Sequence, residues 1–113
     1  MDEDLSRAVV TPLQIDVEGT ATHPVLTARG EIDVATSPRL RTELANLIGR
    51  GARDITLQFG GVTFVDSSGL GVLVGAYKRL REESDGRIRI VGAQQSVRKV
   101  FEITGLERAL LTD

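Results

Sequence analysis

Apolar residues in this sequence alternate between two spacings, one typical of strands and one typical of helices. Residues 13–18 alternate between apolar and polar, which is the two-residue period of a strand with one buried face. The runs 25–32, 55–59 and 87–91 are short, apolar and rich in strand-forming residues. The sequence therefore predicts four strands, and we expect the glycine pair at 60–61 to end the third of them.

Helical spacing of apolar residues marks three further segments, which begin near residues 37, 68 and 96. We expect Ser37 to cap the first helix and Pro38 to occupy its first position, where no hydrogen-bond donor is needed. The second helix, from about Ser68 to Glu83, is the longest, and its first half is apolar almost all round. That half must be buried. The third helix stops at Gly105, and a short final turn follows it.

The order of these segments predicts a single α/β domain. Turn residues at 19–24 join the first two strands into a hairpin, and helices separate the later strands. Strands joined through a helix normally lie parallel and close right-handed. We therefore expect residues 10–113 to form a mixed sheet of four to five strands with helices packed against it, preceded by a flexible segment at residues 1–9. Functional sites in such sheets lie where a strand ends and the next helix begins.

Three polar residues, Asp66, Ser67 and Ser68, stand together at such a junction, between the third strand and the longest helix. The structural interpretation is that one of them caps the helix, which is the commoner role of such residues. A cap needs only one polar side chain, so at least one hydroxyl group is expected to stay free at the surface. A phosphate on that hydroxyl would add about 1.5 to 2 negative charges beside Asp66 and would act as a binding switch.

Catalysis and nucleotide binding fit this junction poorly. The nucleophile of many hydrolases lies in Gly-x-Ser-x-Gly, but Val65 and Asp66 stand two residues before the two serines. The only histidine, His23, lies in a turn far from them in sequence. The glycines at 69, 71 and 75 fall inside the helix and are spaced for close packing, not for a phosphate-binding turn. We therefore expect neither an enzyme nor a resident cofactor.

The composition excludes several other classes of protein. The 113 residues suffice for one domain, and a net charge of -2 offers no cationic surface to nucleic acid. Without cysteine there is neither a disulfide framework nor a thiolate metal site. No apolar run reaches the roughly 18 residues of a membrane span, and the acidic start lacks the basic segment of a secretory signal. We expect a cytoplasmic protein that contacts neither membranes nor nucleic acid.

Three blocks of the sequence resemble the STAS domain of anti-anti-sigma factors in their order and spacing. They are Gly30-Glu31-Ile32-Asp33, the stretch 62–73 with Asp66-Ser67-Ser68-Gly69 at its centre, and the stretch 96–106. The resemblance extends over residues 13–111. It implies a regulator that binds an anti-sigma factor, a serine kinase of the histidine-kinase-like ATPase type, and so frees a sigma factor for transcription.

The resemblance also implies a role for each residue of the junction. The kinase would phosphorylate Ser67, a serine phosphatase would reverse the reaction, and phosphorylation would release the partner. Ser68 would support the start of the helix. Asp33 would contribute to the partner surface, although a turn-forming aspartate before the first helix explains it equally well. The expected partner-binding residues are Asp33, Phe64, Asp66, Ser67, Ser68, Gly69 and Leu70.

Two further expectations concern the surface around Ser67 and its use. We expect the apolar side chains of Val62, Phe64 and Leu70 to be exposed there and to form part of the interface. The alternative function is a STAS scaffold or accessory subunit of a stress-signalling or lipid-transport complex, with no phosphorylation switch. In either role we expect a monomer or a weak dimer.

Overall fold

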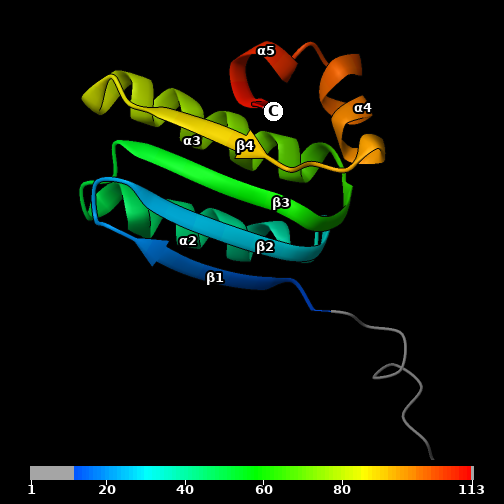
Figure 1. The fold of residues 1–113 in the computed structure, drawn as a ribbon, viewed down its shortest axis with the longest axis horizontal. Coiled ribbons are helices and arrows are strands. Elements are labelled where there is room, and N and C mark those ends of the chain that lie inside the picture. The colour runs from blue at the N-terminus through cyan, green and yellow to red at the C-terminus, as the bar shows by residue number, and fades with distance from the viewer. Residues whose placement is uncertain (1–11, 113) are drawn as a thin grey trace, which may run out of the picture.

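The computed structural model describes residues 12–112, which form one mixed sheet with helices packed against it (Figure 1). Its elements are β1 (Gln14–Gly19), β2 (Pro24–Ile32), α2 (Ser37–Gly49), β3 (Asp54–Val65), α3 (Ser67–Ser84), β4 (Arg87–Val91), α4 (Gln95–Ile103) and α5 (Glu107–Leu110). The strand order is β1-β2-β3-β4, with β1 antiparallel to β2 and the other neighbours parallel. The predicted α/β class is confirmed. The flexible segment expected at residues 1–9 lies outside the described residues.

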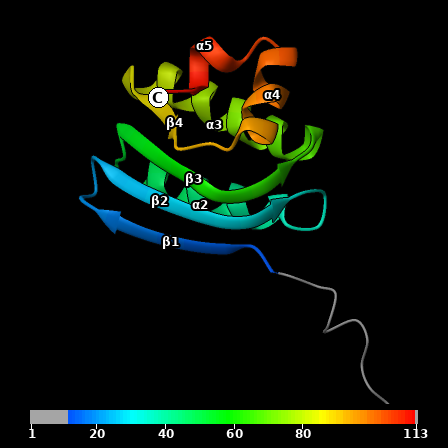
Figure 2. The same cartoon turned by 45° about the vertical axis from the view of Figure 1, so that its right-hand side comes forward.

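The core lies between the sheet and the two longest helices. Figure 2 shows α2 and α3 on the same side of the sheet, while α4 and α5 lie toward β4. The apolar stripes of α2 and α3 meet the alternate strand residues that point toward them, as their spacing predicts. Fully buried core side chains include Leu26, Leu40, Leu44, Ile55, Leu57, Leu73, Leu80, Ile88 and Ile90. None of the helices in residues 12–112 has the length and apolar character to cross a membrane.

The strand β3 continues through the glycine pair at 60–61, so the prediction that these glycines end it is wrong. From Gln58 to Gly61, β3 advances three residues while β2 advances two, and from Val62 to Phe64 it advances two while β2 advances one. Each shift is a bulge, which bends a strand and changes the direction of the side chains that follow. Glycine is common at bulges because it has no side chain to place. Bulges of this kind explain why Val62 and Val65 are buried while Phe64 is exposed.

More than half of β3, residues 59–65, pairs with no described strand on the side of β4. The strand β4 pairs only with residues 54–58, and α4 lies beside the remainder. The Gln94 side chain donates from Nε2 to the carbonyl of Gly60 at 2.9 Å, and the Gly60 amide donates to Oε1 of Gln58 at 3.1 Å. These side chains satisfy backbone groups that a strand would otherwise pair. The buried Val97 and Phe101 of α4 complete the core here.

The start of α2 differs from the prediction by one residue. Ser37 is the first helical residue and is buried, so it does not cap the helix, and Pro38 follows in the first turn. The chain is already turning before Ser37, whose amide donates to the carbonyl of Asp33 at 2.8 Å. The other predicted helices agree with the structure within about one residue. Beyond β4 a fifth strand is reduced to one parallel bridge between Ile90 and Leu111.

Candidate functional site

The carboxyl ends of β2 and β3 bring Asp33 and Asp66 to the same edge of the sheet. Ile32 pairs with Val65 in the parallel register, and the Asp66 amide donates to the Ile32 carbonyl at 3.1 Å. Asp33 and Asp66 are the next residues of the two strands. Because α2 and α3 both begin shortly after them, the amino ends of both helices lie at this edge as well (Figure 1).

Asp66 caps α3. Its Oδ1 accepts hydrogen bonds from the amides of Ser68 at 2.9 Å and Gly69 at 3.3 Å, which otherwise have no partner in the first turn of a helix. The Ser68 hydroxyl donates to the same oxygen at 2.5 Å. The structural interpretation of this aspartate is therefore confirmed, and the Ser68 hydroxyl is committed to supporting the cap.

Ser67 carries the hydroxyl group of the junction that forms no hydrogen bond within residues 12–112. It is exposed at the first position of α3. The capping oxygen of Asp66 bonds to its neighbours at 68 and 69 instead. The prediction that one hydroxyl of this cluster remains free at the surface is confirmed, and the structure identifies it as that of Ser67.

These hydrogen bonds also set the ionisation of Asp66. The Ser68 hydroxyl is the largest cause that lowers the pKa of the Asp66 carboxyl, and the amides of Gly69 and Ser68 lower it further. Each donor stabilises the charged form of the carboxylate. Asp66 is therefore ionised at neutral pH, and Ser67 lies next to a negative charge.

Replacing Ser68 with alanine should raise the pKa of Asp66 toward its ordinary value, because the largest cause of the lowering is lost. A carboxyl with a lowered folded-state pKa contributes stability above its unfolded-state pKa, and this contribution disappears as pH falls through the folded-state value. The wild-type protein should therefore lose stability below about pH 4, and Ser68→Ala should lose less over that interval. Carboxyl-detected NMR titration and urea unfolding at several pH values measure both effects. Ser67→Ala is the control, and it should leave the Asp66 titration unchanged.

Asp33 forms the turn that connects β2 to α2. Its Oδ1 accepts hydrogen bonds from the amides of Ala35 and Thr36, both at 3.0 Å, and the Thr36 hydroxyl accepts one from the Asp33 amide at 2.9 Å. The Thr36 hydroxyl in turn donates to the carbonyl of Glu31 at 2.8 Å. The turn-forming interpretation of Asp33 is thus confirmed. Asp33 also lies beside the end of β3, at the same edge of the sheet as Ser67.

The apolar surroundings of Ser67 differ from the expectation. Val62 is 0% exposed and Leu70 is 9% exposed, so the prediction that both are exposed is wrong, whereas Phe64 is 47% exposed as predicted. Val62 lies between the two bulges of β3 and points inward, and Leu70 is on the side of α3 that faces the core. Gly69 is also buried. Of the predicted partner-binding residues, the exposed apolar side chain is that of Phe64.

Val34 is an exposed apolar residue that sequence reasoning missed. It follows Asp33 in the loop after β2 and is 76% exposed. The sequence contains a signal for this exposure, because Val34 lies in a loop whose apolar residues show neither strand nor helix periodicity. A valine in such a loop has no predicted buried face. Val34 and Phe64 lie at the same edge of the sheet as Ser67, because they flank the paired ends of β2 and β3.

The only histidine of the sequence, His23, lies far from Ser67. His23 precedes β2, at the opposite end of the strand from Asp33, and its Nε2 lies 3.2 Å from Oδ2 of Asp54. The nine residues of β2 separate the two ends by roughly 30 Å. The described residues also contain no group of three or more acidic or histidine side chains that could hold a metal ion. Within residues 12–112, the exposed Ser67 hydroxyl therefore has neither a histidine nor a metal-binding cluster beside it.

Comparison with known proteins relates this fold and junction to a family. A family model described as the STAS domain matches residues 14–112. An anti-sigma-B factor antagonist of Staphylococcus aureus (strain NCTC 8325 / PS 47) is 40% identical over 78 residues, which cover 69% of this chain and 71% of that protein.

Two solved structures of SpoIIAA show the same fold. The anti-sigma factor antagonist SpoIIAA in its unphosphorylated form matches with a TM-score of 0.77 and 28% identity, covering 88% of this chain and 89% of that one. The Bacillus cell fate determinant SpoIIAA in its phosphorylated form matches with a TM-score of 0.68 and 26% identity, covering 88% and 92%. The family model and the similarity to these proteins show that the chain belongs to the STAS domain family.

Proposed function

We propose that this chain is an anti-sigma factor antagonist and that phosphorylation of Ser67 switches it off. The unmodified protein binds an anti-sigma factor in the cytoplasm and thereby frees a sigma factor. The observation that carries the proposal is the exposed Ser67 hydroxyl, which is free of hydrogen bonds within residues 12–112. Relatives that are anti-sigma factor antagonists, one of them known in phosphorylated and unphosphorylated forms, support it.

The geometry of the junction favours Ser67 over Ser68 as the phosphate acceptor. A kinase must reach the hydroxyl oxygen and remove its proton, which requires an exposed side chain. Ser67 is exposed, whereas Ser68 is half-buried and its hydroxyl proton is donated to Asp66. Phosphorylation of Ser68 would break the bond that supports the cap of α3, while phosphorylation of Ser67 leaves that cap in place.

The capped helix end explains how a phosphate would act as a switch. Two amides of the first turn of α3, those of Ser68 and Gly69, already bond to the ionised Asp66 and are not available to neutralise a phosphate. A phosphoserine carries about 1.5 to 2 negative charges at neutral pH. At Ser67 that charge stands beside Asp66, with Asp33 at the end of the neighbouring strand, and faces outward toward the partner. Binding is weakened by like-charge repulsion and by the cost of removing water from the phosphate.

The partner surface in this proposal combines the polar edge with two apolar side chains. Phe64 and Val34 are the exposed apolar residues beside the junction, and Asp33 and Asp66 are its charges. Aromatic residues are enriched among those that dominate interface energies, so Phe64 is the expected apolar anchor. Gly69 and Leu70 support this surface indirectly, because both are buried and hold the first turn of α3 in place.

In this role the chain is a substrate and a ligand, not an enzyme. The kinase, which is the anti-sigma factor itself, and a serine phosphatase supply the chemistry in both directions. The junction supports this division, since Ser67 has neither a nearby histidine nor a metal-binding cluster among the described residues.

Substitution of Ser67 tests the proposal. Ser67→Ala should bind the cognate anti-sigma factor as tightly as the unmodified protein, and Ser67→Asp and the phosphorylated protein should bind at least tenfold more weakly, equivalent to about 1.4 kcal/mol or more. Titration calorimetry measures the affinities. Incubation with the anti-sigma factor and ATP should add one phosphate by intact mass, peptide mapping should place it on Ser67, and phosphatase treatment should restore binding.

Ser68→Ala is the matched control, because it removes the neighbouring hydroxyl and leaves the Ser67 acceptor in place. It should still gain one phosphate, whereas Ser67→Ala should gain none. A phosphate mapped to Ser68, or equal affinity of modified and unmodified protein, contradicts the switch. Absence of any phosphate with an active kinase favours the alternative role as a scaffold or accessory subunit.

A further inference from the structure

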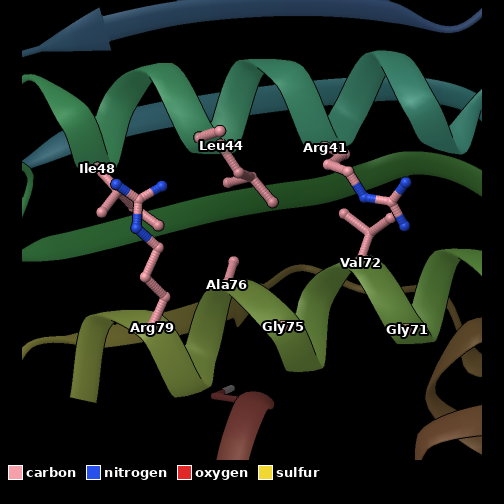
Figure 3. A pocket seen from close by; sticks show the side chains of 9 residues that line it. Arg41, Leu44, Ile48, Gly71, Val72, Gly75, Ala76 and Arg79 are labelled. Carbon is pink, nitrogen blue, oxygen red and sulfur yellow. The ribbon is translucent and has the colours of Figure 1, made fainter. Parts of the chain in front are cut away.

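A groove of about 250 Å³ lies between α2 and α3 (Figure 3). Its inner wall is apolar and includes Leu44 and Val72, which are buried, while Gly71 and Gly75 at its rim are exposed. The complete lining is Arg41, Leu44, Ala45, Ile48, Gly71, Val72, Gly75, Ala76 and Arg79. The groove is smaller than the roughly 300–1,000 Å³ of pockets that enclose small molecules.

The two glycines of α3 that line the groove have no role in packing within the described chain. A Cβ atom built at Gly71 or at Gly75 would meet nothing within 4 Å, whereas at Gly69 it would come within 2.6 Å of Ile32. Glycine weakens the interior of a helix more than any residue except proline. The missing side chains at 71 and 75 leave the groove clear, so the space between α2 and α3 is accessible from outside residues 12–112.

Arginine side chains mark the two ends of the groove. In Figure 3, Arg41 extends from α2 toward Val72, and Arg79 extends from α3 toward Ile48. Val72 and Arg79 are seven residues apart, or roughly 10 Å along the helix axis. The Arg41 guanidinium makes no hydrogen bond or ion pair within the described residues, and Arg79 bonds Glu83 through Nε at 3.0 Å, leaving its other nitrogens available.

We propose that this groove binds an acidic amphipathic helix of a partner protein. Such a helix carries carboxylates at positions i and i+7, which are spaced to meet the two arginines, and apolar side chains at i+3 and i+4, which enter the apolar centre. Charge complementarity favours this occupant over a second copy of the chain, because a symmetric contact through the groove would place Arg41 and Arg79 against the same arginines. The acidic helix is also favoured over a fatty acid, because the single carboxylate of a fatty acid can pair with only one of the two separated arginines.

This surface is distinct from the Ser67 junction and goes beyond the proposed function. Ser67 is the first residue of α3, and the groove begins one turn later and continues toward Arg79. None of the residues assigned to the Ser67 surface lines the groove. One chain can therefore contact a partner at the edge of the sheet and another helix along α2 and α3.

The test uses a fluorescent 16-residue alanine-based peptide with glutamates at i and i+7 and leucines at i+3 and i+4. Fluorescence anisotropy should show saturable binding to the full-length protein. A peptide with glutamine in place of both glutamates should bind at least tenfold more weakly. Arg41→Gln combined with Arg79→Gln should weaken binding of the acidic peptide by a similar factor, since both carboxylates lose their partners.

Gly75→Leu is the complementary variant, because it adds a large apolar side chain at the rim of the groove, where a Cβ atom would meet nothing within 4 Å. It should abolish peptide binding while its melting temperature stays at or above that of the wild-type protein. Ser67→Ala should bind the peptide normally. No binding at millimolar peptide, or equal binding by Gly75→Leu, overturns the proposal. Analytical ultracentrifugation could instead show self-association that Gly75→Leu removes, and this result would overturn the proposal in favour of a second copy of the chain. Saturable binding of decanoate without binding of the peptide would overturn it in favour of an amphiphile.

Discussion

Replacing Phe101 with alanine is expected to lower the free energy of unfolding by about 3–5 kcal/mol, the largest effect of any single truncation considered for this protein. Phe101 is 0% exposed and is one of the two largest side chains that are fully buried. It anchors α4 over the part of β3 that no strand pairs with on that side. Truncation leaves a cavity at this position and removes one of the two buried side chains of α4. Urea unfolding followed by circular dichroism measures the loss.

Ile103 supplies the matched control from the same helix. It is 78% exposed, so Ile103→Ala removes apolar atoms that are already in water and should change stability by no more than about 0.5 kcal/mol. Equal effects of the two substitutions would show that α4 does not pack against β3 through Phe101.

Replacing Gly69 with alanine is expected to destabilise the protein by about 1–3 kcal/mol, despite the better helix propensity of alanine. A Cβ atom at this position would lie 2.6 Å from Cγ2 of Ile32 and 3.1 Å from Cγ1 of Val65. Both neighbours are buried, so α3 must move away from the strands to accommodate it. Because Ser67 lies two residues earlier, we expect that movement to displace the phosphorylation site and to weaken binding of the anti-sigma factor.

Gly75→Ala is the control for this prediction, since it makes the same chemical change in the same helix. A Cβ atom at Gly75 meets nothing within 4 Å, so the substitution should stabilise the protein by up to about 1 kcal/mol. Thermal unfolding of the two variants compares them directly. Two variants that shift in the same direction would contradict the close contact between α3 and the ends of β2 and β3.

The sequence was sufficient for those elements whose evidence is local. The alternation in residues 13–18, the helical stripe of α2 and the left-handed Gly105 after α4 all act within a few neighbouring residues, so the pattern predicts where these elements lie. The predicted buried face of the first strand is observed only in part, since Leu13 is buried, Ile15 is half-buried and Val17 is exposed. The aspartate cap of α3 belongs to the same class. Asp66 bonds residues two and three positions ahead, and the free hydroxyl of Ser67 follows from that assignment.

The errors concern features that depend on contacts between distant parts of the chain. Whether the glycine pair at 60–61 ends a strand or forms a bulge is decided by its pairing with β2, about thirty residues earlier. The same bulges determine which of Val62 and Phe64 points inward, and the pattern of their own segment cannot show this. Leu70 was expected to be exposed because it is close to Ser67 in sequence, but it faces the core one helical turn later.

The position of β1 at the edge of the sheet has a consequence for the behaviour of the protein at high concentration. Its outer edge pairs with no strand among the described residues, and free edges can recruit other chains into extended sheets. Asp16 and Glu18 are exposed on this strand, and the Arg29 guanidinium holds Asp16 at 3.3 Å. Such charges oppose stacking of identical edges, because like charges would meet. Neutralising both, as Asp16→Asn with Glu18→Gln, would remove that protection against aggregation.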